Sequence, residues 1–594
     1  MTSGQSAKAV ADGVYTTTCW ECSAYCGALA TVKDGKVVNY APNPASPHSA
    51  GAFCIKGIRG APGLTYNPNR LLYPHRRIGT RGEGKWARIS WDEALDEIAD
   101  RLAEVRRTYG PEAIVGATSG AAFSRSIVTA LMLRSIGSPN WMINQDLCGG
   151  CRAVSGKIRG EDIDNTRCAL IVGRNAQIAD PVEWAKLKAA KKRGARMIVI
   201  DPKRTTAAEL ADIWMCPRVG TDAAIALAMM HVLISEGLYD RQFVNERCHG
   251  FEALAERAAQ FPPDTTERLT GVPAQQIVEA ARIFADGPST FVSGHGIDAA
   301  SNGVQTFRAF HALAAISGNI DRPGGNLRQR TPKGFSSYLE LLHRPEHRLP
   351  ADVEARTIGA DRFPLWAGPR GWQTACHNPS VIEAMLTGKP HPVRALYASG
   401  VNILVTYPDT RRTIAALRSL DFVAVAAPQM TPTAEWADIV LPKTTTLEEE
   451  EVMFVPSGPT VVFTRATVPP QGEARTEIGI AAPLLDRLEA RQAVTARLMP
   501  WRSQRELNTH LLGDSGITIE MLEAEGFHQV SSDPVPASRP FPTGTGKIEL
   551  YSPQLEELGL DPLPGYVAPE REGKTADIRT RYPLVVVTGD REKS

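Results

Sequence analysis

The sequence has no long apolar run and no excess of charge of one sign. Its longest apolar stretch, Ala223–Ile234, spans 12 residues and includes His231, far fewer than the roughly 20 needed to cross a bilayer. Lysine and arginine number 66 against 65 aspartate and glutamate, a formal net charge of +1. Such a balance creates no long-range field to hold a nucleic acid backbone or an anionic membrane surface. We therefore predict no nucleic-acid partner and no direct membrane insertion.

The first 15 residues also lack the basic start, the apolar core and the twin arginines of an export signal. This predicts a cytoplasmic location, with export alongside a signal-bearing partner as the alternative. Glycine (50) and proline (43) are not scarce, and 43% hydrophobic with 22% charged residues is typical of a globular chain with many loops. At 594 residues the chain is expected to form several structural units.

Short apolar, β-branched runs alternate with helical patterns over most of the chain, which predicts a multi-domain α/β fold with parallel sheets. The helix signal is clearest after Ser90, where Ser90 and Glu93 form a capping box before apolar residues at helical spacing. The predicted strands are Lys36–Tyr40, Ala113–Gly116, Cys168–Gly173, Arg196–Asp201, Thr290–Ser293, Arg394–Ser399, Phe422–Ala426 and Leu584–Thr588.

Four cysteines near the amino terminus form the strongest local motif. Cys19, Cys22 and Cys26 follow the spacing Cys-x2-Cys-x3-Cys, and Cys54 comes after 27 intervening residues. Three thiolates on one short loop can wrap one face of a four-iron, four-sulfur cubane while a fourth closes the site. We therefore predict a 4Fe-4S cluster, with zinc and a structural or disulfide arrangement as the alternatives. Lys56 would place an ammonium group near the cluster.

The six other cysteines have less informative spacing. Cys148 and Cys151 form a single Cys-x2-Cys pair, which fits a redox dithiol and half of a zinc site equally well. The others share no pattern and are predicted to be small buried residues. They are Cys168, Cys216, Cys248 and Cys376.

Motifs rich in glycine and acidic residues follow the predicted strands in a fixed order. Gly173-Arg174-Asn175-Ala176 and Val199–Thr205 stand at the ends of two successive predicted strands. Val219-Gly220-Thr221-Asp222, Ser317–Gly325 and Ala437–Pro442 come later. Together with the cysteine pattern, this series resembles the molybdenum or tungsten bis-pterin guanine dinucleotide oxidoreductases, the dimethyl sulfoxide reductase family, over nearly the whole chain.

The resemblance implies where the guanine dinucleotides bind. Gly173 and Asn175 would meet a diphosphate, since a glycine at the carboxyl end of a parallel strand lets the backbone approach closely and the next helix offers N–H groups. Asp201 would accept hydrogen bonds from ribose hydroxyls and Asp222 from the guanine edge; the alternatives are a plain helix cap and a first-turn acid. The implied cofactor-binding set also contains Asn144, Gly220 and Asn402.

The resemblance also implies an active site. Related enzymes with a cysteine ligand carry a cofactor-contacting asparagine four residues before it, and Asn144 and Cys148 have this offset. Cys148 is therefore predicted to bind molybdenum or tungsten through its thiolate, with Cys151 as the alternative. His295 and Asp298 lie on a loop expected near the metal. They are candidates for proton transfer or, alternatively, a hydrogen-bonded structural pair.

The resemblance divides the chain into interleaved segments. It implies an N-terminal iron–sulfur module at residues 14–73, an α/β domain formed by 74–140 and 326–445, and a nucleotide-binding α/β domain at 141–325. Residues 446–578 would return to the N-terminal domain and form a connection. Residues 579–594 would begin a C-terminal pterin-binding domain, which the sequence as printed leaves incomplete.

These features predict a molybdopterin-dependent oxidoreductase. A small substrate would react at the metal, and electrons would pass through the pterin and past Lys56 to the cluster and on to an iron–sulfur partner subunit. Sulfur oxyanions or polysulfide suit relatives with a cysteine ligand. Gly149 stands where formate dehydrogenases have a histidine after the metal ligand, which argues against formate. The alternatives are a non-redox hydratase or transhydroxylase of the acetylene hydratase type and a non-catalytic electron-transfer subunit.

Overall fold

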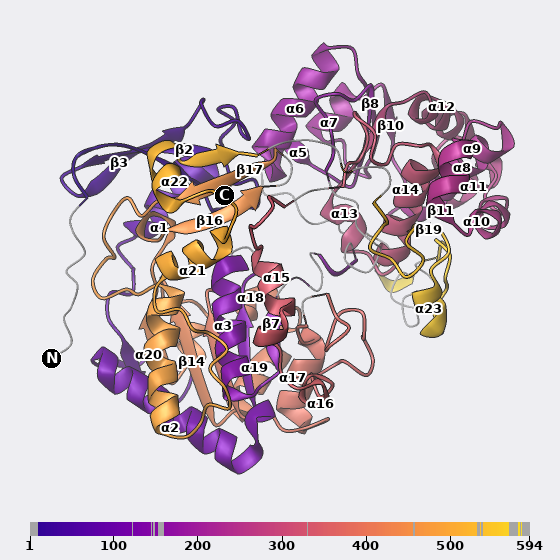
Figure 1. Ribbon diagram of the computed structural model, residues 1–594. Coiled ribbons are helices and arrows are strands. Elements are labelled where there is room, and N and C mark those ends of the chain that lie inside the picture. Colours follow the sequence, from indigo (N-terminus) through magenta and orange to yellow (C-terminus); the bar gives the residue numbers. More distant parts are fainter. Residues whose placement is uncertain are drawn as a thin grey trace. The chain divides into compact units, whose positions relative to one another are not determined.

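The structure of the chain is a computed structural model with two compact units (Figure 1). Unit 1 consists of residues 1–146, 331–455 and 459–530, and unit 2 of residues 147–330, 456–458 and 531–594. Asn144, Cys148 and residues 585–588 of the last predicted strand lie outside the described residues. The described residues are 10–120, 123–143, 145, 149–151, 160–328, 331–372, 374–455, 458–530, 535, 539–568, 580–582 and 584.

A seven-stranded sheet forms the centre of unit 1, in the order β5-β4-β15-β14-β13-β6-β7. Strands β7, β6, β13, β14 and β15 are parallel, whereas β4 and β5 extend the sheet antiparallel. Every residue of β6, β13 and β14 is buried, as expected for strands covered by helices on both faces. The strands are β4 (His75–Arg77), β5 (Trp86–Arg88), β6 (Ile114–Thr118), β7 (Trp141–Ile143), β13 (Ala395–Ser399), β14 (Phe422–Ala427) and β15 (Ile439–Pro442).

Helices cover both faces of this sheet (Figure 1). Helix α2 begins as predicted, because the Ser90 hydroxyl accepts from the Glu93 N–H at 3.2 Å and the Glu93 carboxylate accepts from the Ser90 N–H at 2.8 Å. One face carries α2 (Trp91–Tyr109), α3 (Phe123–Ile136), α15 (Tyr338–His343) and α20 (Glu477–Ala490). The other carries α17 (Asn378–Thr387), α18 (Ile403–Thr406) and α19 (Thr410–Ser419). The short helix α16 (Ala351–Glu354) follows α15.

Two small antiparallel sheets complete unit 1. The first contains β1 (Gly13–Thr18), β2 (Gly27–Lys33) and β3 (Lys36–Pro42), and is followed by the π-helical turn η1 (Lys56–Gly60) and by α1 (Ala61–Thr65). The second contains β16 (Glu451–Val455), β17 (Thr460–Thr464) and β18 (Phe527–Gln529), with α21 (Gln504–Leu512) and α22 (Ile519–Glu525) packed on it. The two sheets are joined directly, because the Thr464 hydroxyl donates to the Thr18 carbonyl at 3.2 Å.

Unit 2 is built on a parallel four-stranded sheet in the order β10-β9-β8-β12. The strands are β8 (Cys168–Val172), β9 (Arg196–Ile200), β10 (Ile213–Met215) and β12 (Ser289–Ser293). Helices α8 (Asp222–Ser235), α12 (Ala274–Ala285) and α14 (Gly303–Ile316) pack on one face, and α6 (Pro181–Lys192) and α7 (Thr206–Leu210) on the other. The remaining elements are α5 (Ala176–Ala179), α9 (Arg241–Arg247), β11 (Cys248–His249), α10 (Phe251–Ala258), α11 (Pro263–Thr270), α13 (His295–Asp298), β19 (Ile548–Glu549) and α23 (Pro553–Glu557).

The predicted strands that fall within the described residues begin and end within two residues of the observed ones. Residues 531–594 group with unit 2, where β19 pairs with β11. The prediction for Cys216 was wrong: it is exposed, because it lies past the end of β10, whereas the other three scattered cysteines are buried. No helix of the described residues combines the length and apolarity needed to span a bilayer.

Candidate cofactor site

Three of the predicted cluster ligands lie on the loop that joins β1 to β2. The Cys19 N–H donates to the Cys26 carbonyl at 2.9 Å, which closes the loop at its base. Cys19 and Cys26 are buried and Cys22 is partly buried. Burial raises the pKa of the Cys19 thiol, and the nearby charges of Glu21, Cys22 and Cys26 raise it further. The three thiols therefore lie within electrostatic reach of one another.

The turn that follows Cys54 packs against this loop. The Cys54 carbonyl accepts from the N–H groups of Gly57 and Ile58, both at 3.1 Å. A Cβ atom added at the buried Gly57 would lie 3.0 Å from the Cys19 Sγ atom and 2.7 Å from the Phe53 ring. Only glycine therefore fits between the Cys54 turn and Cys19. Lys56, the first residue of η1, is partly buried.

The donor set fits an iron–sulfur cluster. Four cysteine thiols are the usual ligands of a cubane, which takes one thiolate at each of four corners. Within the described part of the chain, no three His, Cys, Asp or Glu side chains gather closely enough to hold a single metal ion. Independently of this, the four thiols lie in two adjoining loops, as the ligands of a cluster of several irons would.

In unit 2, two loops meet at the carboxyl edge of the parallel sheet. The strand order places the crevice that usually binds nucleotides between β8 and β12. Gly173 follows β8 with a φ of +56°. A Cβ atom at Gly294, after β12, would lie 1.9 Å from the Gly173 carbonyl oxygen, and one at Gly296 would lie 2.8 Å from the Gly173 Cα. Three glycines therefore let the two backbones touch at the predicted diphosphate position.

The other nucleotide-binding candidates of unit 2 lie at the same edge. Asn175 is the N-cap residue of α5, and Gly220 adopts a φ of +84° in the turn before α8. Asp201 follows β9, where its carboxylate accepts from the Lys203 N–H at 2.8 Å. Asp222 is the first residue of α8, and burial together with the Asp201 charge raises its pKa to about 6. Carboxylates at these two positions suit the hydroxyl and N–H donors of a ribose and a guanine.

The proton-transfer candidates form a pair in the structure. His295 Nδ1 lies 3.0 Å from an oxygen of Asp298, whose side chain is 0% exposed, whereas that of His295 is 52% exposed. The Cys151 thiol donates to the Asp298 carbonyl at 3.3 Å and would lie 3.0 Å from a Cβ atom at Gly303. The structure thus brings His295, Asp298 and Cys151 together after β12.

Asn402 belongs to unit 1, at the carboxyl end of β13. Its side-chain oxygen accepts from the Thr433 hydroxyl at 2.8 Å and from the Thr433 N–H at 3.3 Å. This contact fixes the loop after β14 beside the start of α18. Asn402 therefore already holds two loops of the sheet edge together, in addition to its predicted contact with a cofactor.

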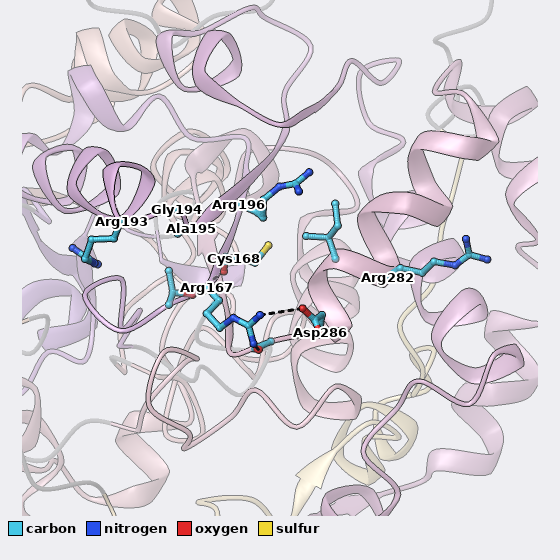
Figure 2. Close-up of a pocket in the computed structure, with 11 residues that line it drawn as sticks. Arg167, Cys168, Arg193, Gly194, Ala195, Arg196, Arg282 and Asp286 are labelled. Carbon is cyan, nitrogen blue, oxygen red and sulfur yellow. Dashed lines mark hydrogen bonds and ion pairs between the residues drawn. The ribbon is translucent and has the colours of Figure 1, made fainter.

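A cavity of about 580 Å³, which the sequence did not point to, opens at the amino edge of the unit 2 sheet (Figure 2). It lies opposite the predicted nucleotide residues, because it is lined by Cys168 and Arg196, the first residues of β8 and β9. Its lining is basic, yet most of its guanidinium groups face carboxylates. The pairs are Arg167–Asp286 at 3.3 Å, Arg196–Asp212 at 3.2 Å and Arg282–Glu236 at 2.8 Å.

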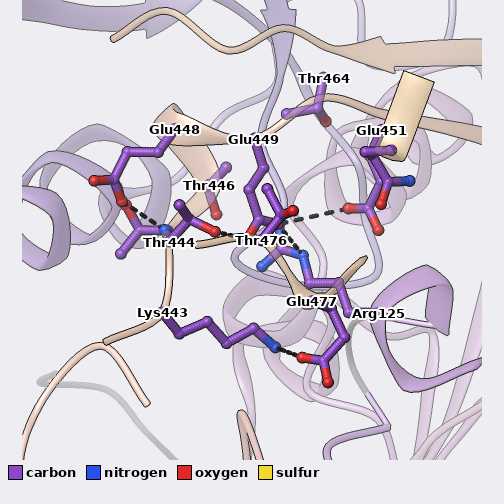
Figure 3. Close-up of polar contacts among 12 residues, drawn as sticks. Arg125, Lys443, Thr444, Thr446, Glu448, Glu449, Glu451, Thr464, Thr476 and Glu477 are labelled. Atoms are coloured by element: carbon purple, nitrogen blue, oxygen red, sulfur yellow. Dashed lines mark hydrogen bonds and ion pairs between the residues drawn. The ribbon is translucent and has the colours of Figure 1, made fainter. Parts of the chain in front are cut away.

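A buried charge cluster of unit 1 also escaped sequence reasoning (Figure 3). Lys443 Nζ lies 2.6 Å from Glu477, and Arg125 lies 2.5 Å from Glu449 and 3.5 Å from Glu451. Lys443 directly follows β15, Arg125 lies on α3, and Glu477 is the first residue of α20, while Glu449 and Glu451 lie just before and at the start of β16. The only sequence signal is the run of four acids at 448–451, which resembles a solvated face.

Comparisons with known proteins agree with the predicted cofactors. The molybdopterin oxidoreductase family model matches residues 70–487, and the model of the molybdopterin oxidoreductase Fe4S4 domain matches residues 12–62. The chain is 32% identical to acetylene hydratase of Syntrophotalea acetylenica over 617 aligned residues, which cover 97% of this chain and 82% of the relative. It is 30% identical to the thiosulfate reductase molybdopterin-containing subunit PhsA of Salmonella typhimurium, with 93% and 76% covered. The solved structure of acetylene hydratase from Pelobacter acetylenicus matches with a TM-score of 0.87 at 30% identity, covering 97% of this chain and 83% of that one.

Proposed function

Because this chain belongs to the molybdopterin oxidoreductase family, the dimethyl sulfoxide reductase family that its motifs resemble, we propose that it catalyses a two-electron conversion of a small substrate. Its cofactors are a 4Fe-4S cluster and a molybdenum- or tungsten-bound molybdopterin. Electrons would pass between the metal and a redox partner by way of the cluster. The observation that carries this proposal is the adjoining pair of cysteine loops, since an electron-transfer cluster serves a redox reaction directly.

We assign the cofactor ligands to the residues described above. Cys19, Cys22, Cys26 and Cys54 would hold the cluster, and Lys56 would place a positive charge beside it. In unit 2, residues at the carboxyl edge of the sheet would bind one guanine dinucleotide through its diphosphate, ribose and base. They are Gly173, Asn175, Asp201, Gly220 and Asp222. Asn402 in unit 1 would contribute to a second dinucleotide, and Cys148, with Asn144 beside the cofactor, would supply the thiolate for the metal.

His295 and Asp298 would move a proton during turnover. In the tautomer with its proton on Nδ1, His295 donates to the buried side chain of Asp298 and leaves Nε2 as the basic nitrogen. The imidazole is half exposed, so Nε2 would take up a proton from substrate or solvent and return it. When bound, the metal cofactor supplies the two-electron chemistry itself.

The electron partner would dock near the cluster. Cys54 is partly buried, and the neighbouring Ile55 and Ile58 expose 50% and 41% of their surface. Exposed apolar side chains beside an electron-transfer site suit a protein partner. The relative PhsA is named as the molybdopterin-containing subunit of a thiosulfate reductase, which supports a partner subunit that carries the electrons. The same name makes a sulfur oxyanion the first substrate class to test.

A second candidate is a hydration that consumes no electrons. It is favoured by the 32% identity to acetylene hydratase and by the TM-score of 0.87 to a solved acetylene hydratase. In that case the cluster would not exchange electrons with a partner during turnover, and the His295–Asp298 pair would handle the protons of water.

The requirement for an electron donor distinguishes the two candidates. The full chain, loaded with metal and cluster, is supplied with thiosulfate, polysulfide or dimethyl sulfoxide together with a reduced viologen dye, and separately with acetylene and water but no donor. We expect oxidation of the dye with one of the sulfur substrates and no product from acetylene. A His295→Gln variant should lose turnover but keep its cluster spectrum. Conversion of acetylene without a donor, with no oxidation of the dye, would overturn the redox assignment.

A further inference from the structure

Tyr40 buries its hydroxyl group inside the N-terminal module without a hydrogen bond. The residue lies on β3 and is 2% exposed. Among the described residues, no group lies within hydrogen-bond reach of its hydroxyl. Two other tyrosines of the module are satisfied: the Tyr66 hydroxyl accepts from the Val37 N–H at 2.7 Å, and the Tyr15 hydroxyl donates to the Ala11 carbonyl at 2.8 Å. Since buried polar groups are rarely left without a partner, Tyr40 points to a group that the chain itself does not supply.

The phenol lies against the cysteine loops. Tyr40 and Cys19 belong to the same buried apolar cluster, and the Tyr40 ring packs edge-on against Phe53, with ring centroids 5.6 Å apart. Phe53 precedes Cys54 and, together with the Cys19 sulfur, encloses Gly57. A phenol hydroxyl is a hydrogen-bond donor, and the residue that carries this one lies in the same buried group of side chains as Cys19 and Phe53.

We propose that the Tyr40 hydroxyl donates a hydrogen bond to a sulfur atom of the 4Fe-4S cluster or of one of its cysteine ligands. A sulfur acceptor would provide the missing partner of the buried hydroxyl, and the residues that pack around Tyr40 are largely apolar and offer no partner themselves. The inference rests on the cluster of the Fe4S4 domain and does not depend on the substrate or on the direction of electron flow.

Such a bond would set the reduction potential of the cluster. The reduced cluster carries one more negative charge than the oxidised one, and a hydrogen bond to its sulfur atoms stabilises the more negative state. In a buried site of low dielectric this preference is strengthened. Tyr40 would thus raise the reduction potential of the cluster and make it a better electron acceptor.

The test is a redox titration of the full chain with its cofactors bound. The fraction of reduced cluster is measured from its electron paramagnetic resonance signal. Tyr40→Phe removes only the hydroxyl, so we expect a lower midpoint potential, with the ratio of reduced to oxidised cluster at a fixed ambient potential falling about threefold to tenfold. Tyr15→Phe is the matched control. It removes a hydroxyl of the same module, one that donates to the Ala11 carbonyl, and the midpoint potential of its cluster should equal that of the wild type.

Two further measurements keep the inference testable if Tyr40→Phe holds its cluster poorly. Replacement of Tyr40 with 3-fluorotyrosine retains the ring and makes the hydroxyl a stronger donor, so the potential should rise. Electron–nuclear double resonance on protein reconstituted in deuterated water should detect an exchangeable hydrogen at the wild-type cluster that Tyr40→Phe lacks. Equal potentials in the wild type and the Tyr40 variants, or the same hydrogen signal in Tyr40→Phe, would overturn the proposal. A wild-type chain that takes up no iron and sulfide would overturn the cluster, and the proposal with it.

Discussion

Replacing Lys443 with methionine is expected to destabilise unit 1 by about 3–4 kcal/mol. The Lys443 ammonium lies 2.6 Å from Glu477, and their side chains are only 6% and 1% exposed. Methionine fills much of the same space but leaves the Glu477 carboxylate buried without a cation. The hydroxyls of Ser399 and Thr129 still donate to Glu477, so the cost falls in the lower part of the range for a broken buried ion pair.

The assay is native-state hydrogen exchange of the amides in β13 and β15, because a single melting temperature is not well defined for a chain of two units. The double variant Lys443→Met/Glu477→Gln removes both charges and should recover at least half of the loss. Lys85→Met breaks an exposed ion pair with Glu83 and should have a much smaller effect than Lys443→Met, because solvent screens that pair.

The destabilisation should also depend on pH. Burial alone would raise the pKa of Glu477, but Lys443, Ser399 and Thr129 hold it below its usual value. Because the folded-state pKa is depressed, the pair stabilises the fold above the unfolded pKa, and this contribution is lost as pH falls through the folded value. The difference between wild type and Lys443→Met should therefore shrink in acid. A loss below 1 kcal/mol at neutral pH, or one that does not change with pH, would refute the reasoning.

Three other variants test separate parts of the structure. Gly294→Ala places a methyl group 1.9 Å from the Gly173 carbonyl oxygen, so it should cut the guanine nucleotide released per chain on denaturation at least tenfold, and full retention would contradict the assigned edge. Glu451→Gln tests a carboxyl whose pKa burial raises to about 8. Between the unfolded pKa and pH 8 the folded state holds this proton, so the stability of wild-type unit 1 falls as pH rises through that window, whereas the stability of the variant does not. Identical pH profiles of hydrogen exchange in β16 for the two proteins would exclude this. Cys54→Ser should lower iron and acid-labile sulfide per chain, and unchanged contents would remove Cys54 from the ligand set.

The sequence was most informative where the chemistry is local. The capping box at Ser90 and the strands that end at Val172 and Ile200 depend on neighbours in the chain. The capping box is found as predicted, and the two strands end one residue before their predicted ends. The cysteine spacing indicated the cluster because three of the predicted ligands come from one loop.

The missed features depend on residues far apart in the sequence. Glu448 is buried although it lies in a run of acids, because Arg70 comes from 378 positions away to bond it at 3.0 Å. Arg125 pairs with Glu449 and Glu451 of the run in the same way. The isolated hydroxyl of Tyr40 cannot be recognised until the surrounding atoms are known.

Unit 1 is assembled from segments on both sides of unit 2, and this imposes an order on its synthesis. Strand β6 leaves the ribosome roughly 280 residues before its neighbour β13, a delay of roughly 15–55 s at ordinary translation rates. During that time one edge of β6 has no partner and can pair with other chains. The cysteine loops contact residues beyond 440, so they wait longer still for these partners. Insertion of iron and sulfide into a stable pocket is therefore expected only after these later residues have been made.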